Sequence, residues 1–438
     1  MGCGLSPQPM RVISDSEMRH HHYWKTNLAL LWVSQLMVMA GFAAAMPFIP
    51  LFIADHLGIV DTGPRGAVVA SFNFAGTLGY AIFCPLWGML SDRVGVKPML
   101  YRGTFLAAFI FPLMAWASSS WELVAIRFVS AAMAGTTAAS QILIVKNTPN
   151  DHQGYALGLL GTAYWAGSML GNVLGGFAVV HFGYTIAFFF CGVCYFLAGI
   201  LVFFCKEHKR KFKVQSSELK VDDATVKPSN CQTVKPKGAF TGAVILVLAL
   251  VAGYGFVRYF ELPYVAMRVE EIVGRADAAR WTAIANVFIS VGAFLSGFII
   301  GRLADHIRPA HLLVPALGIT VVLLLIQSFA DNIYTFTVAR TFLYLIGGGL
   351  SAVMQKMLAL LTPPKDRGTV FGVQSTAHSL GVMLSTAASG ALIYELGSHP
   401  STAAWGVRGM FLGAAMLSLL FMPACFVMIR RASRGAAR

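Results

Sequence analysis

The stretch Gly88-Met-Leu-Ser-Asp-Arg-Val-Gly-Val-Lys-Pro98 decides the fold class of this chain. An apolar segment of helical length ends at Gly88, and another begins at Met99. Between them lie a carboxylate, two cations, a Gly and a Pro, which together predict a loop of about ten residues. Loops of this charge join two membrane helices on the side of the bilayer that keeps positive charge. The sequence therefore predicts a protein that spans a membrane.

The composition supports the same class. Hydrophobic residues make up 57% of the chain and charged residues 12%, about half the share that is usual in soluble proteins. A water-soluble domain has no means of hiding so much apolar surface, so that class is excluded. The residues before Asn27 are polar and contain no apolar core of a signal peptide, so we expect no cleaved leader.

Apolar runs close to 20 residues long are candidate membrane helices, and twelve of them follow one another along the chain. We therefore predict an all-α membrane protein with twelve spans. They lie near 27–53, 67–87, 99–117, 121–145, 154–180, 184–205, 240–266, 279–303, 312–330, 333–361, 369–394 and 405–429.

The distribution of positive charge predicts the orientation. Most of the 33 Lys and Arg residues lie in the two tails and in alternate loops. These segments are expected on the cytoplasmic side, with both termini, because positive charge is retained there. The net charge of +14 thus reflects topology, and we expect no nucleic-acid partner. The outer loops hold few cations, namely Arg65, Arg268, Arg275, Arg280 and Arg408.

The chain repeats itself, which predicts two pseudo-symmetric six-helix bundles with a substrate site between them. Gly88-Met-Leu-Ser-Asp92 recurs as Gly301-Arg-Leu-Ala-Asp305, and other polar or helix-breaking residues recur at nearly the same spacing. These pairs are Pro50 and Pro263, Asn73 and Asn286, Arg127 and Arg340, and Gln141 and Gln355. The predicted parts are a tail (1–26), a bundle (27–205), a cytoplasmic linker (206–239), a second bundle (240–430) and a tail (431–438).

The opening stretch resembles the loop signature of the major facilitator superfamily, G-x-L-[AS]-D-R-x-G-x-[RK]. The matching residues are Gly88, Leu90, Ser91, Asp92, Arg93, Gly95 and Lys97. The resemblance implies a transporter whose Asp92 and Arg93 help to hold the inner gate shut. The second copy keeps Asp305 but carries His306 and Arg308 where the first has Arg93 and Gly95. The alternative is that the positive charges of this loop only fix the topology of the chain and have no gating role.

Two further stretches resemble drug/proton antiporters with twelve helices, the bacterial multidrug-efflux branch in particular. Segment 154–180 is similar to the antiporter motif G-x-x-x-G-P-x-x-G-G, except that Asn172 replaces its proline. The first span carries Pro47 and Pro50, like the paired prolines of the same exporters. The residues at the motif positions are Gly167, Gly171, Asn172, Gly175 and Gly176, with Asn172 at the position of the proline.

Several polar and aromatic residues inside the spans are candidate site residues. An Arg in a membrane helix normally faces protein or water, so Arg127 and Arg340 either line the pathway or snorkel to the outer surface. Gln141 and Gln355 are expected near substrate, while Asn73 and Asn286 are expected between helices. The aromatic residues expected to floor the cavity are Phe42, Tyr164, Trp165 and Phe371.

A proton-coupled transporter needs a group that binds and releases a proton. Arg258 and Glu261 place a cation and a carboxylate three residues apart, on one face of a helix. Glu261 is therefore the proton-coupling candidate, together with Arg258 and Arg127. A plain salt bridge at the outer interface remains the alternative.

The combined pattern predicts a proton-driven exporter of amphipathic or lipophilic compounds in an inner or plasma membrane, working by alternating access. The alternative is a proton-coupled importer of a nutrient or metabolite. A non-transporting receptor on this fold fits less well, because the spans keep polar and charged groups. An enzyme also fits less well, because the sequence shows no nucleophile–base pair. We expect no cofactor and no metal site, with a small-molecule substrate, protons and the bilayer as partners of a monomer.

Overall fold

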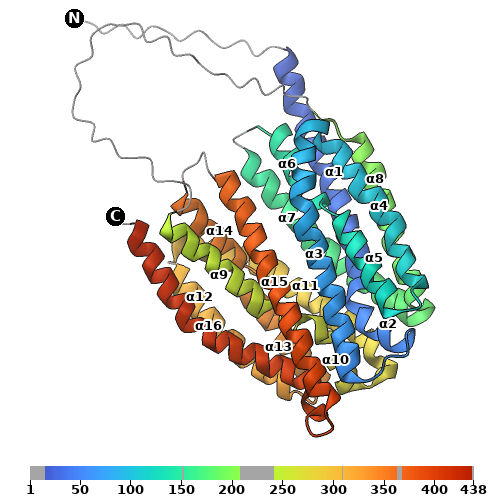
Figure 1. Cartoon of the computed structure of the whole chain (residues 1–438). Coiled ribbons are helices and arrows are strands. Elements are labelled where there is room, and N and C mark those ends of the chain that lie inside the picture. Colours follow the sequence, from blue (N-terminus) through green and yellow to red (C-terminus); the bar gives the residue numbers. More distant parts are fainter. Residues whose placement is uncertain (1–14, 150–151, 208–240, 308, 363–366, 437–438) are drawn as a thin grey trace, which may run out of the picture. The chain divides into compact units, whose positions relative to one another are not determined.

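A computed structural model describes residues 15–149, 152–207, 241–307, 309–362 and 367–436. Most of the predicted cytoplasmic linker (206–239) lies outside these residues, as do residues 1–14 of the predicted first tail. Helices dominate the described residues, which contain no strand (Figure 1). Eleven helical stretches among them are long and apolar enough to cross a membrane. The predicted all-α membrane fold is confirmed.

The helices follow the predicted spans closely. They are α1 (Asp15–Ala45), α2 (Ile49–Asp55), α3 (Thr62–Val94), α4 (Val96–Leu113), α5 (Ser120–Ala132), α6 (Thr136–Asn147), α7 (Gln153–Phe182), α8 (Tyr184–Phe204), α9 (Gly242–Arg258), α10 (Val265–Val273), α11 (Arg275–His306), α12 (Pro309–Phe329), α13 (Ile333–Gly347), α14 (Leu350–Leu361), α15 (Arg367–Ser398) and α16 (Gly406–Ala436).

The first and fourth spans of each repeat are broken, the first spans three residues out of register and the fourth spans at repeat-equivalent glycines. Pro47 and Pro263 lie in short 3-10 turns that separate α1 from α2 and α9 from α10, because Pro cannot donate the backbone bond that continues a helix. Gly135 separates α5 from α6 with φ of 116°, and Gly348 and Gly349 separate α13 from α14. The tenth predicted span, 333–361, is therefore two short helices.

The predicted loop at 88–98 is wrong, because helix α3 continues to Val94 and α4 begins at Val96. Only Gly95 between them leaves the helical conformation, with φ of 109°, a value that Gly adopts without strain. Pro98 falls in the first turn of α4, where a missing N–H costs nothing. Helix α1 begins at Asp15 and α16 ends at Ala436, so helical structure extends into both predicted tails.

Contacts divide the chain into two compact units. The first unit comprises Met1–Gly58, Leu78–Glu207 and Arg275–Ser290, and the second comprises Ile59–Thr77, His208–Gly274 and Val291–Arg438. The first unit thus contains the first repeat without the beginning of its second span, which belongs to the second unit. In exchange, the first unit contains the equivalent segment of the second repeat, the beginning of α11. The division of α3 after Thr77 and that of α11 after Ser290 occur at repeat-equivalent positions.

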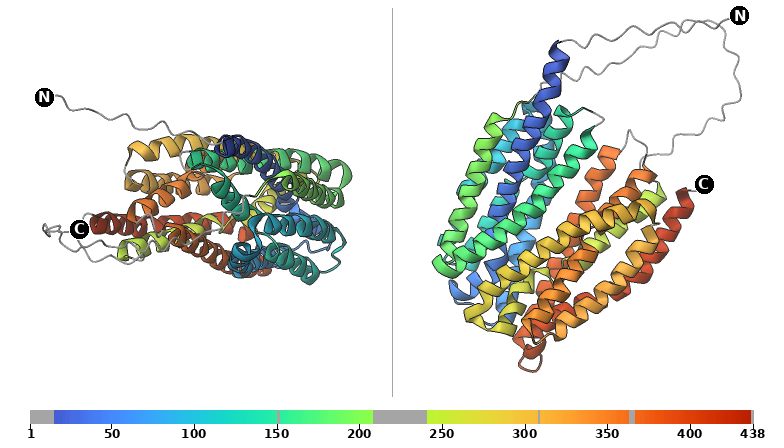
Figure 2. Two further views of the ribbon diagram at one scale, coloured as in Figure 1. Left: turned by 90° about the horizontal axis from the view of Figure 1, so that it is seen from above. Right: turned by 180° about the vertical axis from the view of Figure 1, so that it is seen from behind.

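Each unit has its own packed core. In the first unit α1 lies against α7 and α8, while α4 packs on α8 (Figure 2). In the second unit α9 lies against α15 and α16, and α12 packs on α13 and α16. Ser119 and Asn332, at repeat-equivalent positions, cap α5 and α13 with their side-chain oxygens.

Candidate functional site

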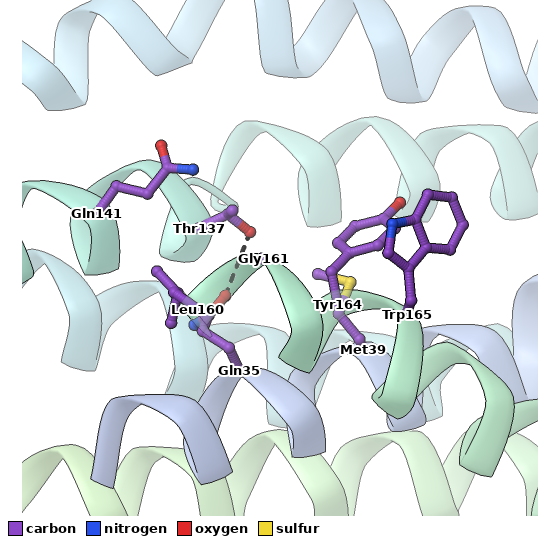
Figure 3. Close-up of a pocket in the computed structure, with 8 residues that line it drawn as sticks. All are labelled: Gln35, Met39, Thr137, Gln141, Leu160, Gly161, Tyr164 and Trp165. Atoms are coloured by element: carbon purple, nitrogen blue, oxygen red, sulfur yellow. Dashed lines mark hydrogen bonds between the residues drawn. The ribbon is translucent and has the colours of Figure 1, made fainter. Parts of the chain in front are cut away.

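A cavity of about 240 Å³ lies within the first unit, between α1, α6 and α7 (Figure 3). Its wall combines apolar surface with amide, hydroxyl and aromatic groups. The residues that line it are Gln35, Met39, Thr137, Gln141, Leu160, Gly161, Tyr164 and Trp165.

The polar groups of this cavity are held in place by one another. Gln35 is buried, and its amide nitrogen donates to Ser140 Oγ at 3.0 Å. Its amide oxygen accepts from Thr137 Oγ1 at 3.3 Å, as Figure 3 shows. The rings of Tyr164 and Trp165 meet edge to face, with centroids 5.1 Å apart. A fixed amide beside two aromatic rings suits a ligand that is mostly apolar with a few polar atoms.

The structure places only some of the predicted cavity residues here. Gln141, Tyr164 and Trp165 line the cavity, whereas Gln355 is exposed on α14. Phe42 does not line it, because its ring packs edge-on against Phe111. Gln355 near substrate stays a prediction.

Arg127 lies on α5 with its guanidinium carbon 5.4 Å from the centre of the Phe42 ring. The side chain is half-buried. A cation over an aromatic face is a stabilising arrangement on its own. The pathway and surface alternatives for Arg127 therefore both stay open.

A buried cluster of charged side chains lies within the second unit. Glu261 is 1% exposed, and its carboxylate accepts from Arg340 at 2.7 Å. Arg258 reaches the other carboxylate oxygen at 3.6 Å, and Gln327 accepts from Arg340 at 3.2 Å. The ring of Tyr344 lies 3.9 Å from the Arg258 guanidinium carbon.

The break in the seventh span builds this cluster. Helix α9 ends at Arg258, and the turn containing Pro263 begins after Glu261, so the carboxylate leaves the helix and meets Arg340 of α13. Arg340 is fully buried, which argues against the snorkelling alternative for this residue and leaves its pathway role a prediction. Its pairing with Glu261 was not visible in the sequence, because the partners are far apart along the chain.

The glycine face of α7 packs against α1. A Cβ at Gly167, Gly171 or Gly175 would collide with the backbone of Leu36, Ala40 or Ala44. Small residues let two helix backbones approach this closely. The face is thus used inside the first unit.

Gly176 faces a different helix, where a Cβ would collide with Ala283 of α11. The repeat-equivalent contact occurs in the second unit between Gly390 of α15 and Ala70 of α3. Asn172 lies on the same side as Gly176. Its amide nitrogen donates to Ser290 Oγ at 3.3 Å and to the Asn286 carbonyl at 3.4 Å.

The residues of the loop signature lie at the α3–α4 junction. Gly88 and Leu90 are half-buried on α3, and Arg93 is exposed. Asp92 and Asp305 belong to α3 and α11, and their side chains lie outside the described part of the structure. Lys97 donates from Nζ to the Phe203 carbonyl at 2.9 Å.

Sequence reasoning missed Glu207, which binds the N-terminus of α4. Its carboxylate accepts from the backbone N–H groups of Val96 at 2.9 Å and Lys97 at 3.0 Å. The preceding carbonyl, of Lys206, accepts from Asn27 at 2.8 Å and Asn147 at 2.9 Å. An acid among many cations directly after a span was the available signal.

The Major Facilitator Superfamily model matches residues 31–274 and 276–438. Multidrug resistance protein MdtG of Salmonella dublin is 29% identical over 82% of this chain and 86% of its own. That of Dickeya zeae is 28% identical over 94% and 96%.

Solved structures show the same fold. A bacterial homologue of the human lysosomal transporter Spinster has a TM-score of 0.70 and 16% identity, covering 93% of this chain and 97% of its own. A D-xylose-proton symporter has a TM-score of 0.71 and 15% identity, covering 91% and 97%. The spans, the internal repeat and the family match lead to one conclusion: the chain is a multi-pass membrane transporter of small molecules and belongs to the Major Facilitator Superfamily.

Proposed function

We propose that the protein exports amphipathic or lipophilic small molecules in exchange for protons, by alternating access. The observation that carries the proposal is the cavity of about 240 Å³ in the first unit. Its aromatic rings, Met39 and fixed amide of Gln35 offer apolar area with few directional polar contacts. Such a wall accepts ligands of varied shape, as a multidrug transporter requires.

The relatives named multidrug resistance proteins favour export over import. The importer alternative rests on Asn172, which replaces the proline of the antiporter motif. Asn172 donates a hydrogen bond to Ser290. The replacement of proline by Asn172 therefore has a structural role that favours neither import nor export.

Proton coupling is assigned to Glu261, with Arg258 beside it and Arg127 as a second candidate in the other repeat. Glu261 is buried among groups from three helices, so a change in its protonation changes their packing. The test is Glu261→Gln in proteoliposomes. We expect substrate exchange without a gradient to continue and uphill transport to stop; a mutant that still concentrates substrate assigns Glu261 a structural role.

The gating role is assigned to Asp92, Arg93 and Asp305, as the family signature implies. Their positions at the ends of α3 and α11 support this. Asp92→Asn removes the charge and keeps the shape, so we expect slower transport with normal membrane insertion. Transport at the wild-type rate would leave the signature as a topology anchor.

The placement in the cell follows from the charge distribution. We assign the protein to an inner or plasma membrane, as a monomer with both termini and the linker 206–239 in the cytoplasm. The predicted bundles 27–205 and 240–430 are proposed as the two halves that rock during transport.

The function is tested by dye accumulation in cells with and without the protein, before and after the proton gradient is collapsed. We expect lower accumulation in cells that carry the protein, and loss of the difference after collapse. Glu261→Gln is the matched variant: we expect it to reach the membrane and to leave dye accumulation unchanged. No effect with several dyes would favour the importer.

A further inference from the structure

The charged cluster of the second unit has one negative charge too few. Arg258 and Arg340 both face Glu261, which compensates one of them. The next cation, Arg268, approaches the Gln327 carbonyl at 3.5 Å, but it is paired with Glu271 at 2.9 Å. Among the described residues, one positive charge of this cluster is therefore left without a counter-charge.

The unused hydrogen-bond donors belong to the same two side chains. Nε and Nη2 of Arg340 and Nη2 of Arg258 are buried and make no hydrogen bond to the described residues. Arg340 is fully buried and Arg258 is 12% exposed. Buried guanidinium N–H groups are costly to leave without acceptors. The Tyr344 ring stabilises the Arg258 guanidinium in part through a cation–π contact, but it does not neutralise the positive charge.

A small cavity is lined by Arg258, whereas Arg340 is not among its lining residues. Its volume is about 10 Å³, which is close to the space that one water-sized particle needs. Arg258 and Glu261 line it together with hydroxyl-bearing side chains, whose donors are turned to backbone carbonyls: Tyr254 to Gly347, Thr320 to Ala316 and Ser418 to Ala414.

We propose that this cavity binds a monovalent anion of about the size of chloride, held by Arg258 next to the Arg340–Glu261 pair. The anion supplies the missing charge and accepts a hydrogen bond from Nη2 of Arg258. It comes either from dissolved chloride or from the carboxylate of a transported molecule. The second source rests on the proposed export function, whereas the first is independent of it.

The chloride source is tested on purified protein by thermal unfolding, with chloride exchanged for gluconate at constant ionic strength. Chloride should raise the Tm of the wild type, because a ligand that binds only the folded state stabilises it. Arg258→Gln removes the excess charge, so its Tm should be insensitive to chloride. Thr320→Asp places a carboxylate in the cavity wall and should have the same effect. Arg408→Gln removes a cation paired with Asp331 elsewhere in the unit and should keep the chloride response.

The carboxylate source is tested by transport of rhodamine B and its ethyl ester, which differ only in that group. The wild type should bind and export the acid several-fold better than the ester, and Arg258→Gln should bind the two dyes equally in a fluorescence titration. A wild type with neither a chloride response nor an acid preference overturns the proposal, as does a response that Arg258→Gln retains. Failure to export either dye would instead contradict the export function, which the chloride measurement does not involve.

Discussion

The contact between the Glu207 carboxylate and the N-terminus of α4 predicts a measurable contribution to stability. Glu207 accepts from two backbone N–H groups at 2.9 and 3.0 Å, at a helix N-terminus where a negative charge is favoured. Glu207→Gln keeps one acceptor oxygen but removes the charge. We expect a loss of about 1–2 kcal/mol, the range for a helix cap with a charged acceptor. That corresponds to a Tm lower by about 2–8 °C.

The assay is thermal unfolding of purified protein followed by tryptophan fluorescence. Glu395→Gln is the matched control, because this carboxylate is 69% exposed and pairs only with His399 at 3.5 Å among the described residues. The control should change the free energy of unfolding by less than about 0.5 kcal/mol. Equal Tm values for Glu207→Gln and the wild type would show that the contact does not hold the end of α4, and the argument would fail.

Three other changes should be measurable. Gly171→Leu drives a side chain into the α1 backbone and should abolish folded, membrane-inserted protein. Gly161→Ala, whose added methyl group meets open space, is the control and should be near wild type. Gel filtration in detergent measures both variants. Arg340→Gln removes the 2.7 Å hydrogen bond to Glu261 and leaves Arg258 as its counter-charge, so it should cost about 1.5–3 kcal/mol, the range for a hydrogen bond to a charged group; an unchanged Tm would refute the pairing. Burial raises the pKa of the Cys205 thiol to about 11, so at pH 7–9 it should stay protonated and resist maleimide, as mass-spectrometric mapping would show, and rapid labelling would contradict the burial.

The sequence predicted the fold well because its main signals are local. Apolar length, positive charge and the repeat each report on a segment without reference to distant partners. The error at 88–98 has the same origin. Gly95 and Pro98 predict a loop, but one Gly with positive φ is enough to end a helix, and a Pro is tolerated in the first turn of the next.

The site was harder to predict because its contacts join residues far apart in the chain. Glu261 was found as a candidate, but its neighbour in sequence, Arg258, lies farther from it than Arg340 does. The glycine motif was recognised, yet which helix it packs against depends on the fold as a whole. Glu207 was overlooked because a single acid in a polar segment carries no periodic signal.

The division of α3 and α11 between the two units has a consequence for biogenesis. Residues 59–77 leave the ribosome long before the segments they pack against, since Gly66 and Ala70 meet Ile393 and Gly390 near the other end of the chain. The first half must therefore wait in the membrane with part of a helix unpartnered until synthesis is nearly complete. A chain cut in the linker would yield two fragments, neither of which is a complete folding unit, so we expect each to be degraded alone and to be rescued only by co-expression with the other.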